Sequence, residues 1–452
     1  MSRYQLKCLH ADCGQTFERN DAIRLTCEGE VEGRHSAALL RPVYPKAQIE
    51  VRPSAPGIFA FDDWLPTWDF EIRSPIELGR PFCYRSTGLA RRLGLSSLYI
   101  AFSGFWPERG PNLLSRSFKE FEAQATLARF LATDWLAPPL PLVISSAGNT
   151  ANGFNLLSTL LDVPLYLVVP ETGLHNLVLP IATHPFVVVV RGDYASAIEV
   201  ADRIAGATGL LREGGARNVA RRAGMGSVML NAVAHPEQGS GRLFDHYFQA
   251  VGSGTGAIAA WESVLLLLAD GRFGSTRTRI HVAQNAPYTP IVDAWRSRSK
   301  TIEAESEAIT QLKIASVTAP VLTNRHPPYS LVGGMRDVLM ESEGGAWAVT
   351  NFDLFHAARM FRECEGIDIG PAAAAAVDAL HQAVRLNCVA ADESVLLHVT
   401  GGGREIQQSG GDVFPIHPRL VIEPKDWRQA VDSIGHPAPV DVARIRERAR
   451  VA

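Results

Sequence analysis

The sequence is poor in lysine and has no long apolar segment. The six lysines are Lys7, Lys46, Lys119, Lys300, Lys313 and Lys425. The longest apolar runs, such as residues 263–269, are far shorter than the roughly 20 residues that cross a bilayer as a helix. A net charge of −3 over 452 residues gives no general attraction to nucleic acid or to an anionic membrane. The first residues, 1–7, lack the apolar core of a signal peptide, so we expect a cytoplasmic protein with neither nucleic acid nor membrane as a partner.

Cysteine is also scarce, and the six cysteines do not form the dense pattern of a secreted disulfide scaffold. Three of them fall within residues 1–40, a polar stretch that we expect to form a ribbon-like appendage: Cys8, Cys13 and Cys27. A closed structural zinc site needs four ligands, and a fourth thiolate is missing here. His10 or His35 could replace it only with adjusted geometry. We therefore expect a degenerate zinc ribbon without metal.

From about residue 97 onward, short apolar segments alternate with amphipathic ones. The expected strands are 98–102, 142–145, 165–170, 186–190, 247–251, 280–284 and 395–399. The expected helices include 119–132, 150–161, 194–207 and 257–268. Continuous apolar strands separated by helices are typical of a mostly parallel sheet that is covered on both faces, so the pattern predicts an α/β fold.

A glycine-rich loop, Gly252-Ser253-Gly254-Thr255-Gly256, lies between an expected strand and an expected helix. Such a turn directs backbone N–H groups and the positive end of a helix toward a phosphate, and Ser253 and Thr255 add hydroxyl donors. The spacing is neither the dinucleotide-binding fingerprint nor a P-loop. Taken alone, the loop is equally well explained as a tight turn that requires glycine.

Two further turns carry polar groups at the ends of expected strands. In Ser146-Ala147-Gly148-Asn149-Thr150, the Asn149 amide could bind a ring substituent, while the N–H groups of the turn could receive a carboxylate. The alternative is a helix cap, a role in which Asn is common. Thr400 precedes three glycines, and its hydroxyl could face a pyridine nitrogen; the alternative is an ordinary strand–turn junction.

Lys119 opens the expected helix 119–132. A cation is slightly disfavoured in the first turn by the helix dipole, and the same position helps to lower the pKa of an amine, as a Schiff-base lysine requires. The alternative is a solvated lysine beside Glu120 and Glu122.

Taken together, these segments resemble the threonine synthase-like group of fold type II pyridoxal phosphate enzymes, and within it the cysteate synthase family. The resemblance covers roughly residues 80–410. It is carried by segments that occur in the family order: 101–110, 117–120, 146–150, 247–256, 259–262 and 400–403.

The resemblance implies the tryptophan synthase β-like fold, with two three-layer α/β/α domains and an N-terminal ribbon-like appendage. Residues 41–118 and 211–452 would form the large domain that binds the cofactor, and residues 119–210 the small one. Because enzymes of this fold are often dimers, a homodimer is also implied.

The resemblance further implies pyridoxal 5′-phosphate as cofactor, with Lys119 as Schiff-base lysine and catalytic residue. Asn149 would contact the 3′-oxygen of the cofactor, Thr400 its ring nitrogen, and Gly252, Ser253, Gly254, Thr255 and Gly256 its phosphate. The remaining substrate-binding candidates are Ser146, Ala147, Gly148, Thr150, Arg109 and Arg116.

The implied reaction is a β-replacement through an aminoacrylate, in which O-phospho-L-serine and sulfite give L-cysteate and phosphate. Arg109 and Arg116 flank the lysine segment, and arginine pairs well with such oxyanions. Two alternatives stay open: a threonine synthase-like elimination and hydration on O-phosphohomoserine, and replacement on phosphoserine by another nucleophile.

Overall fold

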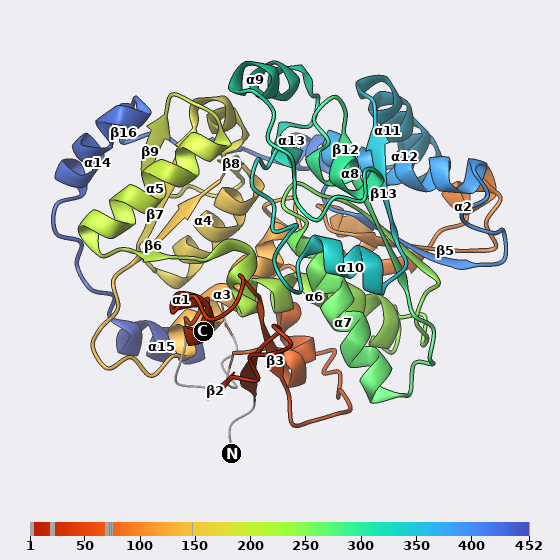
Figure 1. Cartoon of the computed structure of the whole chain (residues 1–452), viewed down its shortest axis with the longest axis horizontal. Coiled ribbons are helices and arrows are strands. Elements are labelled where there is room, and N and C mark those ends of the chain that lie inside the picture. The colour runs from red at the N-terminus through yellow and green to blue at the C-terminus, as the bar shows by residue number, and fades with distance from the viewer. Residues whose placement is uncertain are drawn as a thin grey trace.

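The computed structural model of the chain describes residues 4–18, 23–67, 72, 74, 76–146 and 148–451. Two mainly parallel sheets lie side by side, and the N-terminal strands lie below them in Figure 1. The order of the larger sheet is β13 (Gly345–Val349), β12 (Arg279–Asn285), β11 (His246–Ala250), β14 (Ser394–Val399), β5 (Ser97–Phe102) and antiparallel β4 (Cys83–Arg85). The order of the smaller sheet is β10 (Leu211–Arg212), β6 (Leu142–Ser145), β7 (Leu165–Pro170), β9 (Phe186–Val190) and β16 (Leu420–Ile422).

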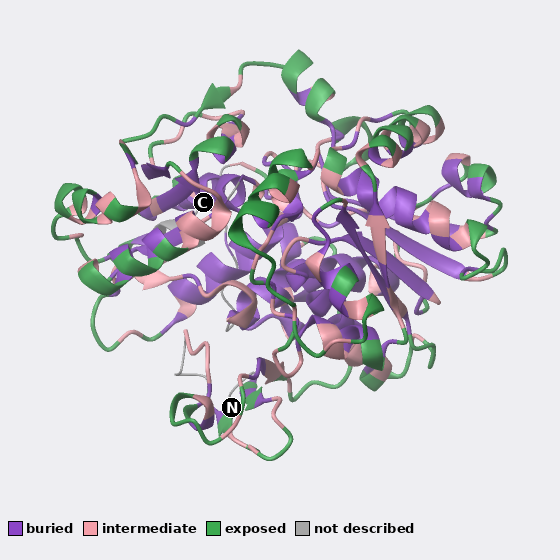
Figure 2. Cartoon of the chain, turned by 45° about the horizontal axis from the view of Figure 1, so that its top comes forward, coloured by how far each residue is buried: buried purple, intermediate pink, exposed green. Residues whose placement is uncertain are grey.

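Both faces of the sheets are buried, which explains why the strands are continuously apolar. In β9, Val187 and Val189 pack into one hydrophobic cluster, whereas Val188 and Val190 pack into another on the opposite face. Successive side chains of a strand point to opposite faces, so a strand covered on both sides needs apolar residues throughout. Figure 2 shows these strands as buried and the outer helices as largely exposed. The expected α/β fold is confirmed.

The polar N-terminal segment forms an antiparallel ribbon of β1 (Gln5–Cys8), β2 (Thr16–Phe17) and β3 (Leu40–Val43), as expected. The other helices are α1 (Glu28–Val31), α2 (Gly88–Leu93), α5 (Tyr194–Thr208), α8 (Pro290–Arg296), α9 (Glu307–Ser316), α10 (Met335–Glu341), α11 (Asn351–Glu365), α12 (Pro371–Arg385), α13 (Arg404–Ser409), α14 (Trp427–Ile434) and α15 (Val442–Val451). A second small ribbon pairs β8 (Val178–Leu179) with β15 (Phe414–Pro415). Within the described part of the chain, no helix is long and apolar enough to cross a membrane.

The pairing of the strands differs from the expected domain boundaries at two places. Strand β10 belongs to the smaller sheet through β6, although the boundary was expected before residue 211. Strand β16 pairs with β9, and α14 packs on α5, so residues 420–434 lie with the smaller sheet rather than with 211–452. The sequence could not indicate that the chain comes back to the smaller sheet, because β16 is only three residues long and its partner strand β9 lies some 230 positions earlier.

Three closely packed helices connect the two sheets: α3 (Lys119–Ala132), α4 (Asn149–Leu161) and α6 (Val219–Ala234). Glycines permit this close approach. A Cβ atom on Gly153 of α4 would lie 2.6 Å from the carbonyl oxygen of Lys119, and one on Gly224 of α6 would lie 2.2 Å from that of Phe121. Both contacts are with backbone atoms of α3, so the position of α3 depends on glycine at these two sites. Helix α7 (Thr255–Asp270) packs on the other side of α6.

We expect Gly224→Ala to destabilise the protein by about 1–3 kcal/mol, because the new methyl group would force α6 and α3 apart. Gly206→Ala is the matched control, since Gly206 is exposed on α5 with nothing within 4 Å of its Cβ position. That change should stabilise by about 0.5–1 kcal/mol. Urea unfolding of both variants measures the difference, and equal stability would contradict the packing argument.

Candidate active site

Segments that are far apart in the sequence line one cavity beside Lys119 at the carboxyl ends of the parallel strands. Its wall includes the predicted cofactor residues and part of the turn after β6: Lys119, Ser146, Gly148, Asn149, Thr150, Gly252, Ser253, Gly254, Thr255, Gly256 and Thr400. Ala147 lies outside the described residues. In open α/β sheets, ligands bind at this edge, so the cavity is the default candidate for a site.

The glycine loop joins β11 to α7 and is shaped to receive an anion. Gly254 has a φ of +80°, a conformation that other residues rarely adopt. A Cβ atom on Gly256 would lie 2.4 Å from the Gln249 side chain, and one on Gly252 would lie 2.9 Å from a backbone oxygen. The loop lines the cavity at the start of a 16-residue helix, a position that fits a phosphate.

The turn after β6 uses Ser146 to cap helix α4. The Ser146 hydroxyl accepts hydrogen bonds from the N–H groups of Gly148 and Ala151, each at 3.1 Å. Asn149 is the first helical residue, and Gly148 occupies the cap position, so the alternative of Asn149 as the cap is wrong. Because another residue caps the helix, the Asn149 side chain lines the cavity without that duty.

Thr400 is held close to Lys119 by backbone pairing. The carbonyl oxygen of Thr400 accepts a hydrogen bond from the N–H of Phe118 at 3.2 Å, and Gly401 forms an isolated bridge with Ser117. The end of β14 therefore runs directly beside the segment that leads into α3. This pairing brings Thr400 to the cavity wall beside Lys119.

The Lys119 amine is largely buried, with 18% of its side chain exposed, so the alternative of a solvated surface lysine is wrong. Its Nζ lies 3.2 Å from Glu122 Oε2 and 4.6 Å from the ring centre of Phe118. Burial lowers the pKa of Lys119, and the nearby Arg221 guanidinium lowers it further, while the Glu122 carboxylate partly opposes both. The amine can therefore lose its proton more readily than an ordinary lysine can.

Sequence reasoning missed the charged chain behind Lys119. Glu122, which is fully buried, also pairs with Arg221 at 3.0 Å, and Arg221 pairs with Glu213 at 2.5 Å. Glu122 could have been suspected, because it lies three positions after Lys119 and therefore on the same helix face. Arg221 and Glu213 gave no such indication, because tertiary packing alone brings them to the site. Arg221 lines the cavity and donates to the Thr150 hydroxyl at 3.3 Å.

A second cavity of about 430 Å³ shares Asn149 and Thr400 with the first, and Arg116 and Arg404 are also in its wall. Arg116 has a φ of +57°, and its buried Nη1 has no hydrogen-bond partner among the described residues. Burial and the neighbouring Arg404 lower the pKa of Arg116. Two neighbouring arginines and an unpaired donor make this cavity suited to an anion.

The structure does not bring Arg109 to either cavity. Its guanidinium lies 4.9 Å from the ring centres of both Tyr84 and Trp106, and the residue is exposed. Stacking on two aromatic rings accounts for this arginine without a substrate. Of the two arginines singled out in the sequence, only Arg116 lines the candidate site.

Residues 86–401 match the family model described as "Pyridoxal-phosphate dependent enzyme". The chain therefore belongs to the pyridoxal phosphate-dependent enzymes. The glycine loop, the lysine with its lowered pKa and the lining of the cavity fit that cofactor.

Curated relatives named "Cysteate synthase" narrow the assignment. The protein of Methanosarcina acetivorans is 41% identical over 94% of this chain and 98% of its own length. The protein of Methanoculleus marisnigri is 42% identical over 92% of this chain and 93% of its own length. Within the pyridoxal phosphate enzymes, the chain is a member of the cysteate synthase family.

Solved structures agree with the fold. Maize serine racemase has a TM-score of 0.54 at 16% identity, covering 72% of this chain and 90% of that one. A pyridoxal 5′-phosphate-dependent aspartate racemase also has a TM-score of 0.54 at 16% identity, and the match covers 72% of this chain and 91% of the racemase. The expected fold type II architecture is thereby confirmed.

We expect the Lys119 amine of the cofactor-free protein to become reactive below the ordinary lysine pKa of 10.5, because burial lowers its pKa. Reductive trapping of pyridoxal phosphate on the Lys119 peptide, measured by mass spectrometry across pH, gives the midpoint. Glu122→Gln should move this midpoint further down, since the Glu122 carboxylate raises the pKa. Glu199→Gln, on the exposed face of α5, is the control. A midpoint at or above 10.5 in the unaltered protein would contradict the electrostatic account.

Proposed function

We propose that the protein converts O-phospho-L-serine and sulfite into L-cysteate and phosphate. The observation that carries this proposal is the convergence of Lys119, the glycine loop 252–256, Asn149 and Thr400 on one cavity, next to a second cavity with two arginines. The name of the curated relatives supports cysteate as the product.

The first cavity would hold the cofactor. The loop 252–256 and the start of α7 would hold its phosphate, Asn149 would bind the 3′-oxygen, and Thr400 would contact the ring nitrogen. Bound there, pyridoxal phosphate supplies an electron sink that stabilises negative charge at Cα of an amino acid.

Lys119 is the group that moves the proton. Its amine would take the proton from Cα of the substrate and later return it there. Between these two transfers, the Cβ–O bond breaks and phosphate leaves with its electron pair. The sulfur of sulfite then forms a bond to Cβ. The lowered pKa of Lys119 favours the neutral amine that the first transfer needs.

The substrate would lie between the two cavities. In the turn after β6, Ser146 and Thr150 would offer hydroxyl groups to the substrate carboxylate, and Gly148 would line the same site. Arg116 and Arg404 face the space next to Asn149 and Thr400, where the leaving phosphate and the incoming sulfite need cationic partners. Both reactants are anions, so this local positive charge matters more than the net charge of the chain.

We further propose that the protein is a homodimer. Light scattering gives the molar mass in solution, which should be twice that of one chain.

The nucleophile can be tested directly. The purified protein with pyridoxal phosphate and phosphoserine should release phosphate in proportion to added sulfite, and mass spectrometry should detect cysteate. Sulfide, amines and water are the alternative nucleophiles, and O-phosphohomoserine is the alternative substrate. Phosphate release from phosphohomoserine with formation of threonine would replace the proposal by the threonine synthase-like reaction. Turnover with a thiol or an amine but not with sulfite would retain phosphoserine and exclude cysteate.

Arg116→Gln should lower kcat/KM for phosphoserine by roughly 10–100-fold, as expected for the loss of a hydrogen bond between charged groups. The variant should still bind pyridoxal phosphate, because Arg116 is not in the wall of the first cavity. Arg109→Gln removes the same charge at the exposed site and should change kcat/KM by less than about threefold. Equal losses in the two variants would exclude Arg116 as the anion contact.

A further inference from the structure

The described part of the N-terminal ribbon contains a compact group of four side chains that the cofactor site does not use. We propose that Cys8, Cys13, Cys27 and His35 bind one Zn²⁺ ion, which fixes the ribbon and the loop against which it packs. Their three sulfur atoms and one ring nitrogen all lie within 4.8 Å of one another. The expectation of a ribbon without metal was based on the missing fourth thiolate, and His35 supplies the fourth ligand.

Two of the separations within the group are close to those of a tetrahedral site, and metal binding would move His35 Nε2 away from the Cys27 sulfur. Zinc bound to sulfur at about 2.3 Å and to nitrogen at about 2.0–2.1 Å places neighbouring sulfurs about 3.8 Å apart and sulfur about 3.6 Å from nitrogen. The Cys13 and Cys27 sulfurs are 3.9 Å apart. His35 Nε2 lies 3.9 Å from the Cys8 sulfur and 3.0 Å from the Cys27 sulfur. Three thiolates and one imidazole are a ligand set that selects zinc.

The His35 ring is oriented as a metal ligand should be. Its Nδ1 lies 2.8 Å from the carbonyl oxygen of Ser36, which can only accept a hydrogen bond. Nδ1 therefore carries the hydrogen, and the lone pair of Nε2 is directed at the sulfurs. Gly29 makes room for the ring, because a Cβ atom there would lie 2.7 Å from Nε2. The His10 ring stacks on the His35 ring, and the two ring centres lie 4.4 Å apart.

The backbone holds the cysteines in place from three different elements. Cys8 ends β1, Cys13 lies in the turn before β2, and Cys27 caps α1 by accepting the N–H of Glu30 at 3.4 Å. Cys8 and Cys27 are almost fully buried. Cys13 and His35 are only partly buried, so the group combines two buried ligands with two that solvent can reach.

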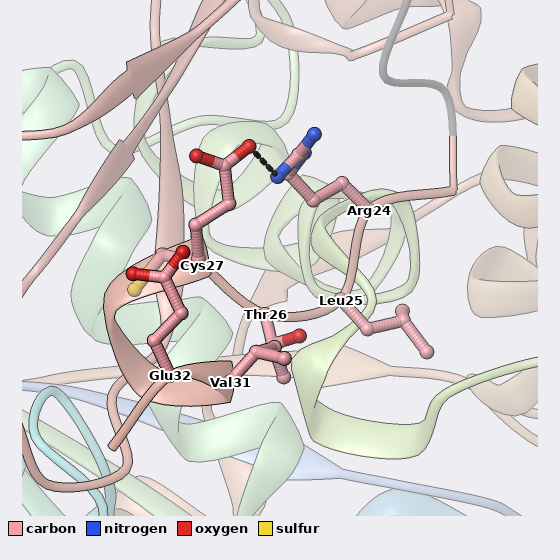
Figure 3. Close-up of a pocket in the computed structure, with 7 residues that line it drawn as sticks. Arg24, Leu25, Thr26, Cys27, Val31 and Glu32 are labelled. Atoms are coloured by element: carbon pink, nitrogen blue, oxygen red, sulfur yellow. Dashed lines mark hydrogen bonds and ion pairs between the residues drawn. The ribbon is translucent and has the colours of Figure 1, made fainter. Parts of the chain in front are cut away.

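Solvent can approach this group from one side. Cys27 is one of seven residues that line a cavity of about 400 Å³, which Figure 3 shows between α1 and the segment that carries Arg24, Leu25 and Thr26. A metal ion or a chelator would reach the ligand atoms through Cys13 and His35, which are partly exposed.

The metal site is connected to the cofactor site through α1. Glu30 of α1 forms a bidentate ion pair with Arg217, which lies in the loop before α6, at N–O distances of 2.7 and 3.0 Å. The Leu25 side chain fills the space beside Gly214 in the same loop, next to Glu213 of the charged chain. A metal that fixes α1 therefore stabilises the loop from which Glu213 contacts Arg221.

Metal content of the full-length, untagged protein tests the proposal. Protein produced with zinc in the medium and purified without chelators should contain about one zinc ion per chain by elemental mass spectrometry. Cys13→Ser and His35→Ala should lose most of it, while His35→Cys, which restores a fourth ligand, should keep it. Cys388→Ser is the matched control, because this thiol is exposed and far from the ribbon in sequence.

Two measurements on the unaltered chain avoid dependence on how the variants fold. Exchange with Co²⁺ should produce the absorption bands of a tetrahedral cobalt–thiolate centre. Chelation should lower the unfolding temperature of the unaltered protein. Zinc well below one ion per chain together with no cobalt spectrum would overturn the proposal. So would equal zinc in all variants, iron in place of zinc, or a Cys13–Cys27 disulfide in freshly purified protein.

Discussion

The site depends on the burial of a basic amine next to a carboxylate that has a second cation as partner. Glu122 is fully buried and lies between Lys119 and Arg221, and Arg221 in turn contacts Glu213. An unpaired buried charge costs several kcal/mol, about 3–5 kcal/mol when one partner of a buried pair is removed. Because Glu122 keeps Arg221 when Lys119 is neutral, the amine can lose its proton without leaving an isolated charge. The chain of alternating charges thus makes a proton-transferring lysine compatible with a buried position.

This electrostatic arrangement requires close helix packing. Lys119 and Glu122 belong to α3, whereas Arg221 belongs to α6, so the pair forms only when the two helices lie very near each other. Gly224 permits that approach toward α3, and Gly153 permits the corresponding approach of α4, which carries Asn149. The glycines therefore fix the positions of Lys119 and Asn149 although neither glycine lines the cavity. The two sheets can then present their strand ends to one shared space.

The sequence predicted the parts of the fold whose information is local. Strands such as β7 and β9 are continuous apolar runs, and they were recognisable because both sides of each strand are buried. The glycine loop 252–256 and Lys119 were recognisable because each lies at a strand–helix or loop–helix junction. Helix α6 escaped prediction, since buried arginines and glycines interrupt its apolar pattern. Its Arg221 contributes to the site through tertiary contacts, which no spacing in a single sequence reveals.

The sequence singled out Arg116 as a candidate anion contact, but the backbone conformation that holds this residue could not be predicted from it. A left-handed conformation costs a residue other than glycine roughly 1–2 kcal/mol, so the surroundings must hold it there. The bridge between Ser117 and Gly401 does so, and a Cβ atom on Gly401 would lie 2.7 Å from the Arg116 carbonyl oxygen. Glycine at 401 thus allows the chain to turn sharply just before Lys119. That turn places a guanidinium in the wall of one cavity and an amine in the wall of the next. The contact that brings Thr400 to the cavity beside Lys119 is therefore the same one that holds Arg116 in the wall of the second cavity.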